Sequence, residues 1–265
     1  MVQLLEALFG AGTRGARRMH QLSRAVLVFD EVQTLPVKCA HLFNNAMNFL
    51  AEQCSTTVLL CTATQPLLHD VNQAKGSIRL ASKPELMPDV GQLFKALQRV
   101  TVNDRRKAGG WADQEVAELA ATEVQNSGSC LVIVNTKASA RRIFELCASV
   151  LASDAIFHLS TDMCPAHRKT RLAALLARLR EGLPTLCVST QLIEAGVDVD
   201  FGSVIRFMAG LDSIAQAAGR CNRNGRRVKG SVYVVNPQVE NLDKLPDILQ
   251  GRNAALRVLD EFRQK

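Results

Sequence analysis

The stretch VLVFDEVQTLP, residues 26–36, places four apolar residues directly before two acids. An unbroken apolar run of this length predicts a strand of a parallel sheet that is buried on both faces. Ionised acids are costly to bury unless they are paired or bind a metal ion. We therefore expect Asp30 and Glu31 to lie at the carboxyl end of the strand, where open α/β sheets place their ligands.

The composition is that of a folded globular protein. Of the 265 residues, 47% are hydrophobic and 22% are charged, and the formal net charge is +7. These values exclude a disordered chain, and the charge is compatible with a phosphate-bearing partner or with an ordinary basic surface. The eight cysteines contain no C-x-x-C pair, so buried free thiols are expected and a zinc site is not. No apolar segment reaches about 18 residues and no signal-peptide pattern is present, so the expected location is cytoplasmic.

Short apolar runs alternate with longer amphipathic stretches, which predicts an α/β fold of parallel sheets with helices on both faces. The expected strands are 25–29, 57–61, 78–81, 99–102, 130–135, 156–159, 185–189, 204–208 and 232–235. The expected helices are 40–54, 113–126, 137–151, 166–181, 214–218 and 243–263, the last interrupted near Pro246 and Gly251. We expect two units: residues 1–90, incomplete at the amino terminus and ending in a linker, and residues 91–265.

Two motifs lie in the first unit. An acid pair after a buried strand is the arrangement of a Walker B site, in which Asp30 would hold Mg²⁺ through water and Glu31 would polarise the attacking water. The alternative is an acid pair that caps a strand at the surface. In LLCTATQP, residues 59–66, the triplet Thr62–Thr64 also ends a strand. These threonines could hydrogen-bond a neighbouring acid, but the triplet taken alone favours a simple strand-to-turn transition closed by Pro66.

Two further motifs lie in the second unit. STQLIEAGVDVD, residues 189–200, ends a strand with hydroxyl, amide and backbone donors and continues to a glycine and Asp198. Such groups suit contacts with phosphate or ribose. QAAGRCNRNGRR, residues 216–227, places Arg220 and Arg223 three residues apart, so that on a helix they would share a face. Arginines presented together can stabilise charge on a transferring phosphoryl group. The alternative for each motif is a solvated basic face or a helix N-cap.

In this order, the acid pair, T-A-T, S-T-Q-x-x-E-A-G-x-D and Q-x-x-G-R-x-x-R resemble motifs II, III, V and VI of superfamily 2 helicases. The Gln of D-E-V-Q, TATQP and GRCNRNGR further resemble the helicase part of the CRISPR-associated helicase-nuclease of type I interference, with subtype I-C as a candidate. The resemblance covers nearly the whole chain. It implies two RecA-like domains that use ATP and Mg²⁺ to move 3′ to 5′ along single-stranded DNA, with a Cascade-type effector complex as a partner.

The resemblance also implies a role for each matching residue. Asp30 and Glu31 would serve Mg²⁺ and the attacking water, while Gln33, at a position where His is usual, would couple the nucleotide site to the second domain. Other implied roles are coupling by Thr62 and Thr64, nucleic-acid contact by Asn135, Thr136, Arg168, Thr190 and Gln191, nucleotide contact by Gly196 and Asp198, the latter at the ribose, and catalysis at the triphosphate by Gln216, Arg220 and Arg223. Ala217 departs from the pattern, because many superfamily 2 helicases carry Arg there.

The 265 residues contain no G-x-x-x-x-G-K-[ST] sequence, the loop that normally cradles the β- and γ-phosphates of ATP. His69-Asp70 has no partner histidines around it, so it is interpreted as a loop dipeptide rather than as part of the family's histidine-aspartate nuclease. We therefore expect this chain to be inactive alone, with a separate chain that carries the phosphate loop and nuclease as a candidate partner. The alternatives are another superfamily 2 helicase fragment, or a non-catalytic module that binds nucleic acid or an effector complex.

Overall fold

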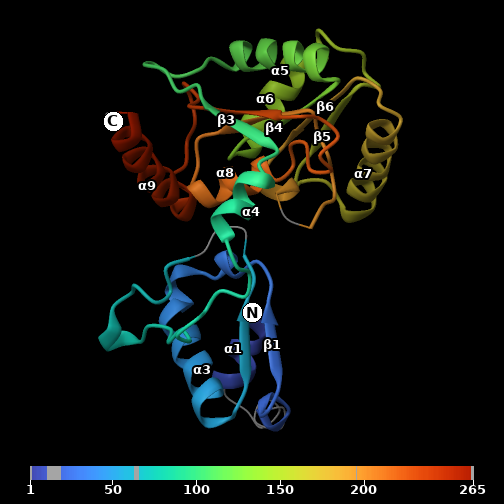
Figure 1. Cartoon of the computed structure of the whole chain (residues 1–265). Helices are drawn as coiled ribbons and strands as arrows, with labels where there is room; N and C mark the ends of the chain where they lie inside the picture. Colours follow the sequence, from blue (N-terminus) through green and yellow to red (C-terminus); the bar gives the residue numbers. More distant parts are fainter. Residues whose placement is uncertain (1, 11–18, 63–65, 195, 264–265) are drawn as a thin grey trace. The chain divides into compact units, whose positions relative to one another are not determined.

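The computed structural model describes residues 2–10, 19–62, 66–194 and 196–263. The chain divides into two compact units, Met1–Gly91 and Gln92–Lys265, which are described separately (Figure 1). Helix α4 (Val90–Ala96) contains the division between them. Within the described ranges, no helix combines the length and the apolar character that crossing a membrane requires.

The first unit contains a two-stranded parallel sheet, β1 (Val26–Phe29) and β2 (Thr57–Leu60), with helices α1 (Val2–Phe9) and α3 (Ala40–Gln53). Helix α3 forms because its apolar residues recur at helical spacing, and Phe43, Met47 and Leu50 are fully or almost fully buried. Burying one such side chain stabilises the fold by about 1.5–3 kcal/mol. Phe43 meets Phe29 of β1 edge to face, with ring centroids 5.1 Å apart.

The prediction that β1 is buried on both faces is wrong for the structure described. Phe29 is buried and Leu27 is half-buried against the core, whereas Val26 and Val28 are 69% and 59% exposed. The strand therefore alternates, as expected of a sheet that is covered on one face.

The predicted strand at residues 78–81 is also wrong, since this segment forms no strand. Side chains of α3 hydrogen-bond its backbone instead of a neighbouring strand. Asn48 donates to the carbonyl of Ser77 at 2.8 Å and accepts from the amide of Arg79 at 2.9 Å. Ile78 is therefore buried in the same core as α3 without joining a ladder, while Leu80 is exposed.

The second unit contains a six-stranded, all-parallel sheet with the strand order β3-β8-β7-β4-β6-β5. The strands are β3 (Val100–Asp104), β4 (Ser129–Ile133), β5 (Ile156–Leu159), β6 (Thr185–Ser189), β7 (Ser203–Phe207) and β8 (Gly230–Val235). The helices are α5 (Asp113–Ser127), α6 (Lys137–Ala148), α7 (Pro165–Arg180), α8 (Leu211–Ala218) and α9 (Pro246–Arg263). The predicted α/β class with parallel sheets is confirmed.

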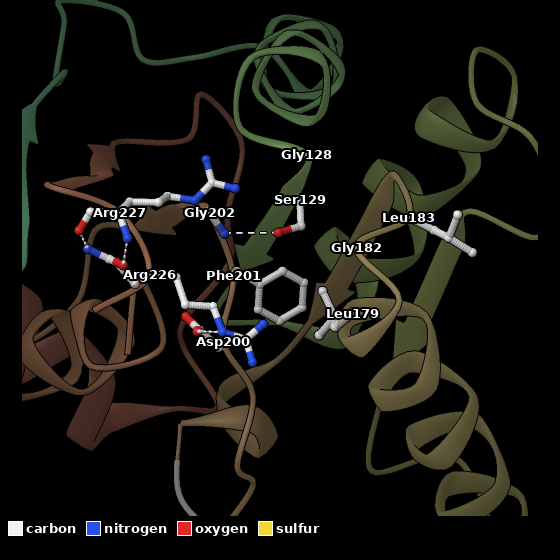
Figure 2. Close-up of a pocket in the computed structure, with 11 residues that line it drawn as sticks. Gly128, Ser129, Leu179, Gly182, Leu183, Asp200, Phe201, Gly202, Arg226 and Arg227 are labelled. Atoms are coloured by element: carbon white, nitrogen blue, oxygen red, sulfur yellow. Dashed lines mark hydrogen bonds and ion pairs between the residues drawn. The ribbon is translucent and has the colours of Figure 1, made fainter. Parts of the chain in front are cut away.

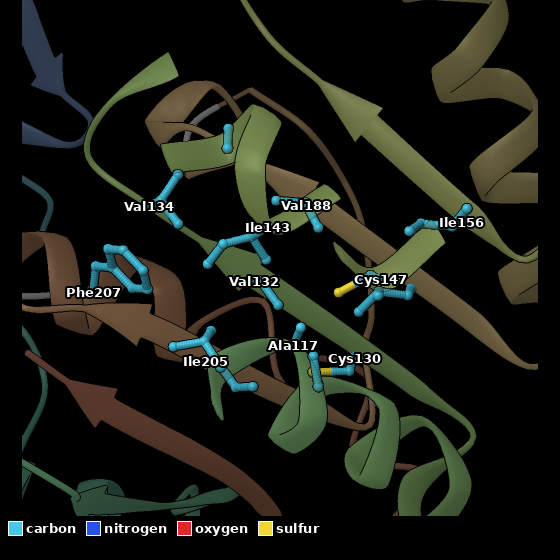
Figure 3. Packing of buried hydrophobic residues seen from close by; sticks show 14 of the residues in the cluster. Ala117, Cys130, Val132, Val134, Ile143, Cys147, Ile156, Val188, Ile205 and Phe207 are labelled. Carbon is cyan, nitrogen blue, oxygen red and sulfur yellow. The ribbon is translucent and has the colours of Figure 1, made fainter. Parts of the chain in front are cut away.

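Both faces of this sheet are covered, which matches the predicted arrangement. Alternate residues of β4 point to opposite sides. Cys130 and Val132 pack with α5 and α6 (Figure 3). Leu131 and Ile133 pack in a second cluster with Leu175 of α7. Every residue of β4, β6 and β7 is buried. These continuous apolar runs are typical of central strands in parallel sheets.

Most of the predicted elements occur within a few residues of their expected ends. Helices α1 and α4 were not predicted, and α8 begins three residues earlier than expected, at Leu211. The last helix, α9, begins at Pro246 and continues through Gly251 without interruption. Pro246 occupies its first position, where a missing backbone donor costs nothing.

Burial raises the pKa of the Cys147 and Cys221 thiols to about 12, so both remain protonated at neutral pH.

Candidate functional site

The acid pair of the first unit lies where the sequence predicts, directly after β1. Asp30 and Glu31 are both exposed, and Glu31 has a left-handed backbone with φ of +55°. Its amide donates to Asp30 Oδ1 at 3.0 Å. A left-handed conformation at a residue other than glycine costs about 1–3 kcal/mol and is concentrated at functional sites. The turn therefore presents two carboxylates side by side to solvent.

Three residues from two predicted motifs form one hydrogen-bonded chain. Thr62, after β2, donates from Oγ1 to Gln33 Oε1, and Gln33 donates from Nε2 to Glu31 Oε2. The two parallel strands place the ends of both motifs at the same edge of the sheet. The second threonine of the triplet, Thr64, lies outside the described residues. A change in the orientation of Glu31 is therefore linked through Gln33 to the segment that begins at Thr62.

In the second unit, several predicted nucleic-acid residues gather at the carboxyl edge of the sheet. Strands β4, β6 and β5 are neighbours in the sheet. The chain continues from β4 to Thr136 and from β6 to Thr190 and Gln191. From β5 it continues through a loop to α7, and Arg168 lies in the first turn of α7. Thr136 caps α6, with its Oγ1 accepting from the amide of Ser139 at 3.1 Å. A 3₁₀ turn, η5 (Gln191–Ile193), follows β6. Gln191 and Arg168 are half-buried, whereas Thr190 is only 8% exposed.

Asn135 is a correction to the predicted nucleic-acid surface. It is 4% exposed, and its side-chain amide donates to the Met208 carbonyl at 3.0 Å and to Glu240 Oε2 at 2.9 Å. Its Oδ1 accepts from Nη1 of Arg206 at 2.6 Å. Because both ends of the amide are engaged inside the protein, Asn135 does not present its side chain to a ligand in this structure.

The buried charges around Asn135 were not predicted from the sequence. Arg206 of β7 is fully buried, and its Nε lies 2.8 Å from Oε1 of Glu194, which is 5% exposed. Burial raises the pKa of Glu194, and the Arg206 guanidinium opposes this rise. Burial likewise raises the pKa of Glu240 and lowers that of Arg206. The available signal was a lone arginine inside the apolar strand SVIRF, residues 203–207.

Two residues predicted to face the nucleotide form an ion pair. Arg223 Nε lies 2.8 Å from Asp198 Oδ1, and both side chains are largely open to solvent. The Arg223 amide also donates to Asp200 Oδ1 at 2.8 Å. Gly196, two residues before Asp198, has φ of +72°, a conformation that favours glycine. The segment that carries Asp198 is therefore fastened to the segment that carries Arg223.

The expected helical face shared by Arg220 and Arg223 is wrong, because α8 ends at Ala218 and both arginines lie in the turn beyond it. Arg220 is 8% exposed and donates from Nε to the Ile193 carbonyl at 3.0 Å and from Nη2 to the Glu194 carbonyl. Its described contacts therefore brace the turn after β6. Gln216 is half-buried on α8, while Ala217 is fully buried, which accounts for a small residue at the position where the family pattern has Arg.

Two pockets of the second unit lie at opposite ends of its strands. One, of about 330 Å³, contains Arg168 and Lys169 together with Ile193 of η5, beside the predicted nucleic-acid residues. The other, of about 320 Å³, lies at the amino ends of β4 and β7, where the Gly202 amide donates to Ser129 Oγ at 2.9 Å (Figure 2). Arg226 and Arg227 line this second pocket, which contains none of the predicted site residues.

Comparisons with known proteins bear on both units. Residues 126–226 match the family "CRISPR-associated nuclease/helicase Cas3, C-terminal". A CRISPR-associated nuclease/helicase Cas3 from Haloferax volcanii is 29% identical over 325 aligned positions, which cover 91% of this chain. They cover 35% of the Haloferax protein, so this chain spans about a third of the length of that relative.

Solved structures show the same fold. A crystal structure of T. fusca Cas3 with AMPPNP superposes with a TM-score of 0.71 and 19% identity, covering 96% of this chain and 35% of that chain. A chain of a CRISPR RNA-guided surveillance complex in a pre-nicking state superposes with a TM-score of 0.64 and 18% identity, covering 97% of this chain and 38% of that chain. These likenesses establish the RecA-like helicase fold. Residues 126–226 are thus similar to the C-terminal family model of Cas3, and nearly the whole chain is similar in sequence and fold to about a third of the length of known Cas3 proteins.

Proposed function

We propose that this chain supplies the C-terminal helicase part of a machine that couples ATP hydrolysis to 3′-to-5′ movement along single-stranded DNA during degradation of foreign DNA. The observation that carries the proposal is the hydrogen-bonded chain from Thr62 through Gln33 to Glu31. It joins the acid pair to the T-A-T segment, as a site that senses a nucleotide and transmits its state requires. The match to the Cas3 family supports the same assignment.

The acid pair fits a Mg²⁺ ion, because both carboxylates are exposed at the carboxyl end of a strand. Mg²⁺ prefers one or two carboxylates together with waters and phosphate oxygens. When bound, it supplies positive charge against the triphosphate. In this proposal Asp30 would hold the ion, and Gln33, which donates to Glu31 Oε2, would orient the Glu31 carboxylate to polarise the attacking water.

In the second unit, the proposed nucleotide contacts lie in the segments around Asp198 and Arg223. Arg223 is the better placed of the two arginines to act as a finger, because its guanidinium is at the surface and its partner, Asp198, is itself exposed. If Asp198 accepted a hydrogen bond from a ribose hydroxyl in place of its ion pair with Arg223, the Arg223 guanidinium would be released to bind the phosphates. Arg220 and Gln216 belong to the same segment, and Gly196 gives the chain its turn before Asp198.

Single-stranded DNA is the proposed nucleic-acid partner, held along the carboxyl edge of the second sheet by Thr136, Arg168, Thr190 and Gln191. The formal net charge of +7 supports backbone contacts without sequence preference. A Cascade-type effector complex is the proposed protein partner, which the likeness to a chain of a surveillance complex supports.

One observation favours a second candidate function, a non-catalytic module that binds nucleic acid. The 265 residues contain no phosphate loop of the type G-x-x-x-x-G-K-[ST]. Without that loop, these residues alone lack the backbone donors that cradle the β- and γ-phosphates. The two candidates differ in whether a phosphate-loop polypeptide restores turnover.

The test is an ATPase assay with single-stranded DNA, performed on this chain alone and with a polypeptide that carries the phosphate loop of a Cas3 relative. We expect no turnover from the chain alone and DNA-stimulated turnover from the mixture, abolished by Glu31→Gln. The matched control is Glu52→Gln, because Glu52 is an exposed acid of the same unit that pairs with Arg79, away from the acid pair. Turnover by the chain alone, or equal turnover by the Glu31→Gln mixture, would contradict the proposed roles.

A further inference from the structure

Arg206 is the largest of the side chains that are almost completely excluded from solvent in the described chain. It lies in β7, where all five residues are buried. Burying a guanidinium is expensive unless other groups pair with it. None of the helicase-like motifs includes this residue, so its contacts must show what the buried charge does.

Those contacts join the ends of three neighbouring strands. Arg206 Nε lies 2.8 Å from Glu194 Oε1, in the segment after β6. Its Nη1 donates to Asn135 Oδ1 at 2.6 Å, after β4, and to the Phe207 carbonyl at 2.9 Å, in β7 itself. Asn135 then reaches Glu240, beyond β8, at 2.9 Å. One guanidinium therefore ties together the carboxyl ends of β4, β6 and β7.

Glu194 is held from two directions. Arg206 pairs with its side chain, while Arg220 donates to the backbone carbonyls of Glu194 and Ile193. The turn η5 therefore ends, at Ile193, where Arg206 binds the Glu194 side chain and Arg220 binds the Ile193 and Glu194 carbonyls. Its position relative to Thr136 on one side and to Arg220 on the other is thus determined by buried contacts rather than by surface ones.

We propose that Arg206 is a positioning residue for nucleic-acid binding, holding the Gln191–Ile193 turn at the distance from the loop after β4 that a DNA backbone requires. The inference rests on the proposed function, because it takes Gln191 and Thr136 as DNA contacts. It goes further by assigning this task to a residue that cannot touch DNA itself. Arg220 supports the same turn from the side of the proposed nucleotide site.

The test replaces both buried charges, with Arg206→Met and Glu194→Met in the same chain. Exchanging a buried ion pair for apolar side chains of similar size often preserves stability. The double variant also keeps the formal net charge, so a loss of DNA affinity would not reflect weaker general attraction. The readouts are unfolding followed by Trp111 fluorescence and the Kd for a labelled single-stranded oligonucleotide. We expect the double variant to remain folded, with a smaller loss of stability than Arg206→Met alone, and its Kd to rise about tenfold, equivalent to about 1.4 kcal/mol.

The matched control removes another largely buried ion pair of the same unit, Arg106 with Asp104, through Arg106→Met and Asp104→Leu. This pair belongs to the β3 end of the sheet, at the opposite edge from β5, and its removal should leave the Kd unchanged. Arg206→Lys provides a third arm, because it keeps the buried charge but cannot reach both Glu194 and Asn135. It should weaken DNA binding about threefold with little loss of stability, equivalent to about 0.7 kcal/mol. It decides the question if the double variant fails to fold.

The possible results separate this inference from the proposed function. Binding of DNA by the unmodified chain, together with an unchanged Kd in a folded double variant or in Arg206→Lys, would overturn the positioning role alone. An equal loss of affinity in the Arg106 control would also overturn it, since any buried pair would then have the same effect. Failure of the unmodified chain to bind single-stranded DNA would overturn the proposed DNA contacts, and this inference with them.

Discussion

Arg206→Met should destabilise the second unit in a manner that depends on pH. The change leaves Glu194, 5% exposed, without the guanidinium 2.8 Å away. Removing one partner of a buried ion pair typically costs about 3–5 kcal/mol. It also removes the donors to Asn135 Oδ1 and the Phe207 carbonyl, acceptors that then remain buried. The loss should therefore be far larger than that of a surface substitution, which is about 0.5 kcal/mol or less.

The part of this loss that arises from Glu194 can be bounded. An isolated buried carboxylate takes up a proton rather than remain charged, and protonating an ordinary glutamate costs about 1.4 kcal/mol for each pH unit above a pKa of about 4.3. The limit is therefore about 3.7 kcal/mol at pH 7 and about 1 kcal/mol at pH 5.

The direction of the pH dependence follows from the raised pKa. Burial already raises the pKa of Glu194 in the native chain, and loss of Arg206 removes a group that opposes the rise. Between the unfolded and folded pKa values, the folded variant binds more protons than the unfolded one. The free energy of unfolding of the variant should therefore be closest to that of the native chain near pH 4. The difference between the two should grow as pH rises, by up to about 2.7 kcal/mol between pH 5 and pH 7.

The assay is urea unfolding at pH 5, 6, 7 and 8, followed by the fluorescence of Trp111. This residue is the single tryptophan of the chain and lies in the second unit, so it reports that unit separately from the first. The control is Arg206→Met combined with Glu194→Gln, which removes one of the two buried carboxyls that Arg206 faces and should reduce the extra pH dependence to the part that arises from Glu240. A loss that is the same at every pH, or a midpoint equal to that of the native chain, would refute the reasoning.

Four further predictions concern the proposed helicase activity and DNA binding. In an enzyme completed with a phosphate loop, Arg223→Ala should lower kcat by as much as about 10³–10⁵-fold with little change in nucleotide affinity, as for arginine fingers elsewhere; near-normal turnover would mean a solvated surface arginine. Arg220→Ala should both lower kcat and shift the Trp111-reported unfolding midpoint, because Arg220 braces the turn after β6. Gln33→Ala should reduce DNA stimulation of ATPase more than the basal rate, and equal loss of both would argue against coupling. Binding of single-stranded DNA should weaken with salt by a slope of about −0.7 per phosphate contact, for oligonucleotides of several sequences, and salt-independent binding would exclude backbone contacts.

The sequence was sufficient for most strands and helices of the second unit and for the strand ends at which several candidate residues lie. Apolar runs such as TLCVS, residues 185–189, avoid water only inside a sheet that is covered on both faces, and this run is followed by the polar residues Thr190 and Gln191. That is why Asp30, Thr136 and Gln191 were located correctly at strand ends. Local pattern reports which residues must avoid water and where the chain turns.

The partners of those residues depended on the tertiary structure. Burial of Asn135 and Arg206, and the bracing role of Arg220, arise from segments far apart in the chain that meet at the ends of neighbouring strands. The exposure of Val26 and Val28 likewise reflects which face of a strand receives a helix. The polarity of a residue determines whether burying it is costly. Whether its polar atoms contact water, an ion partner or a backbone carbonyl depends on the residues that the fold places next to it.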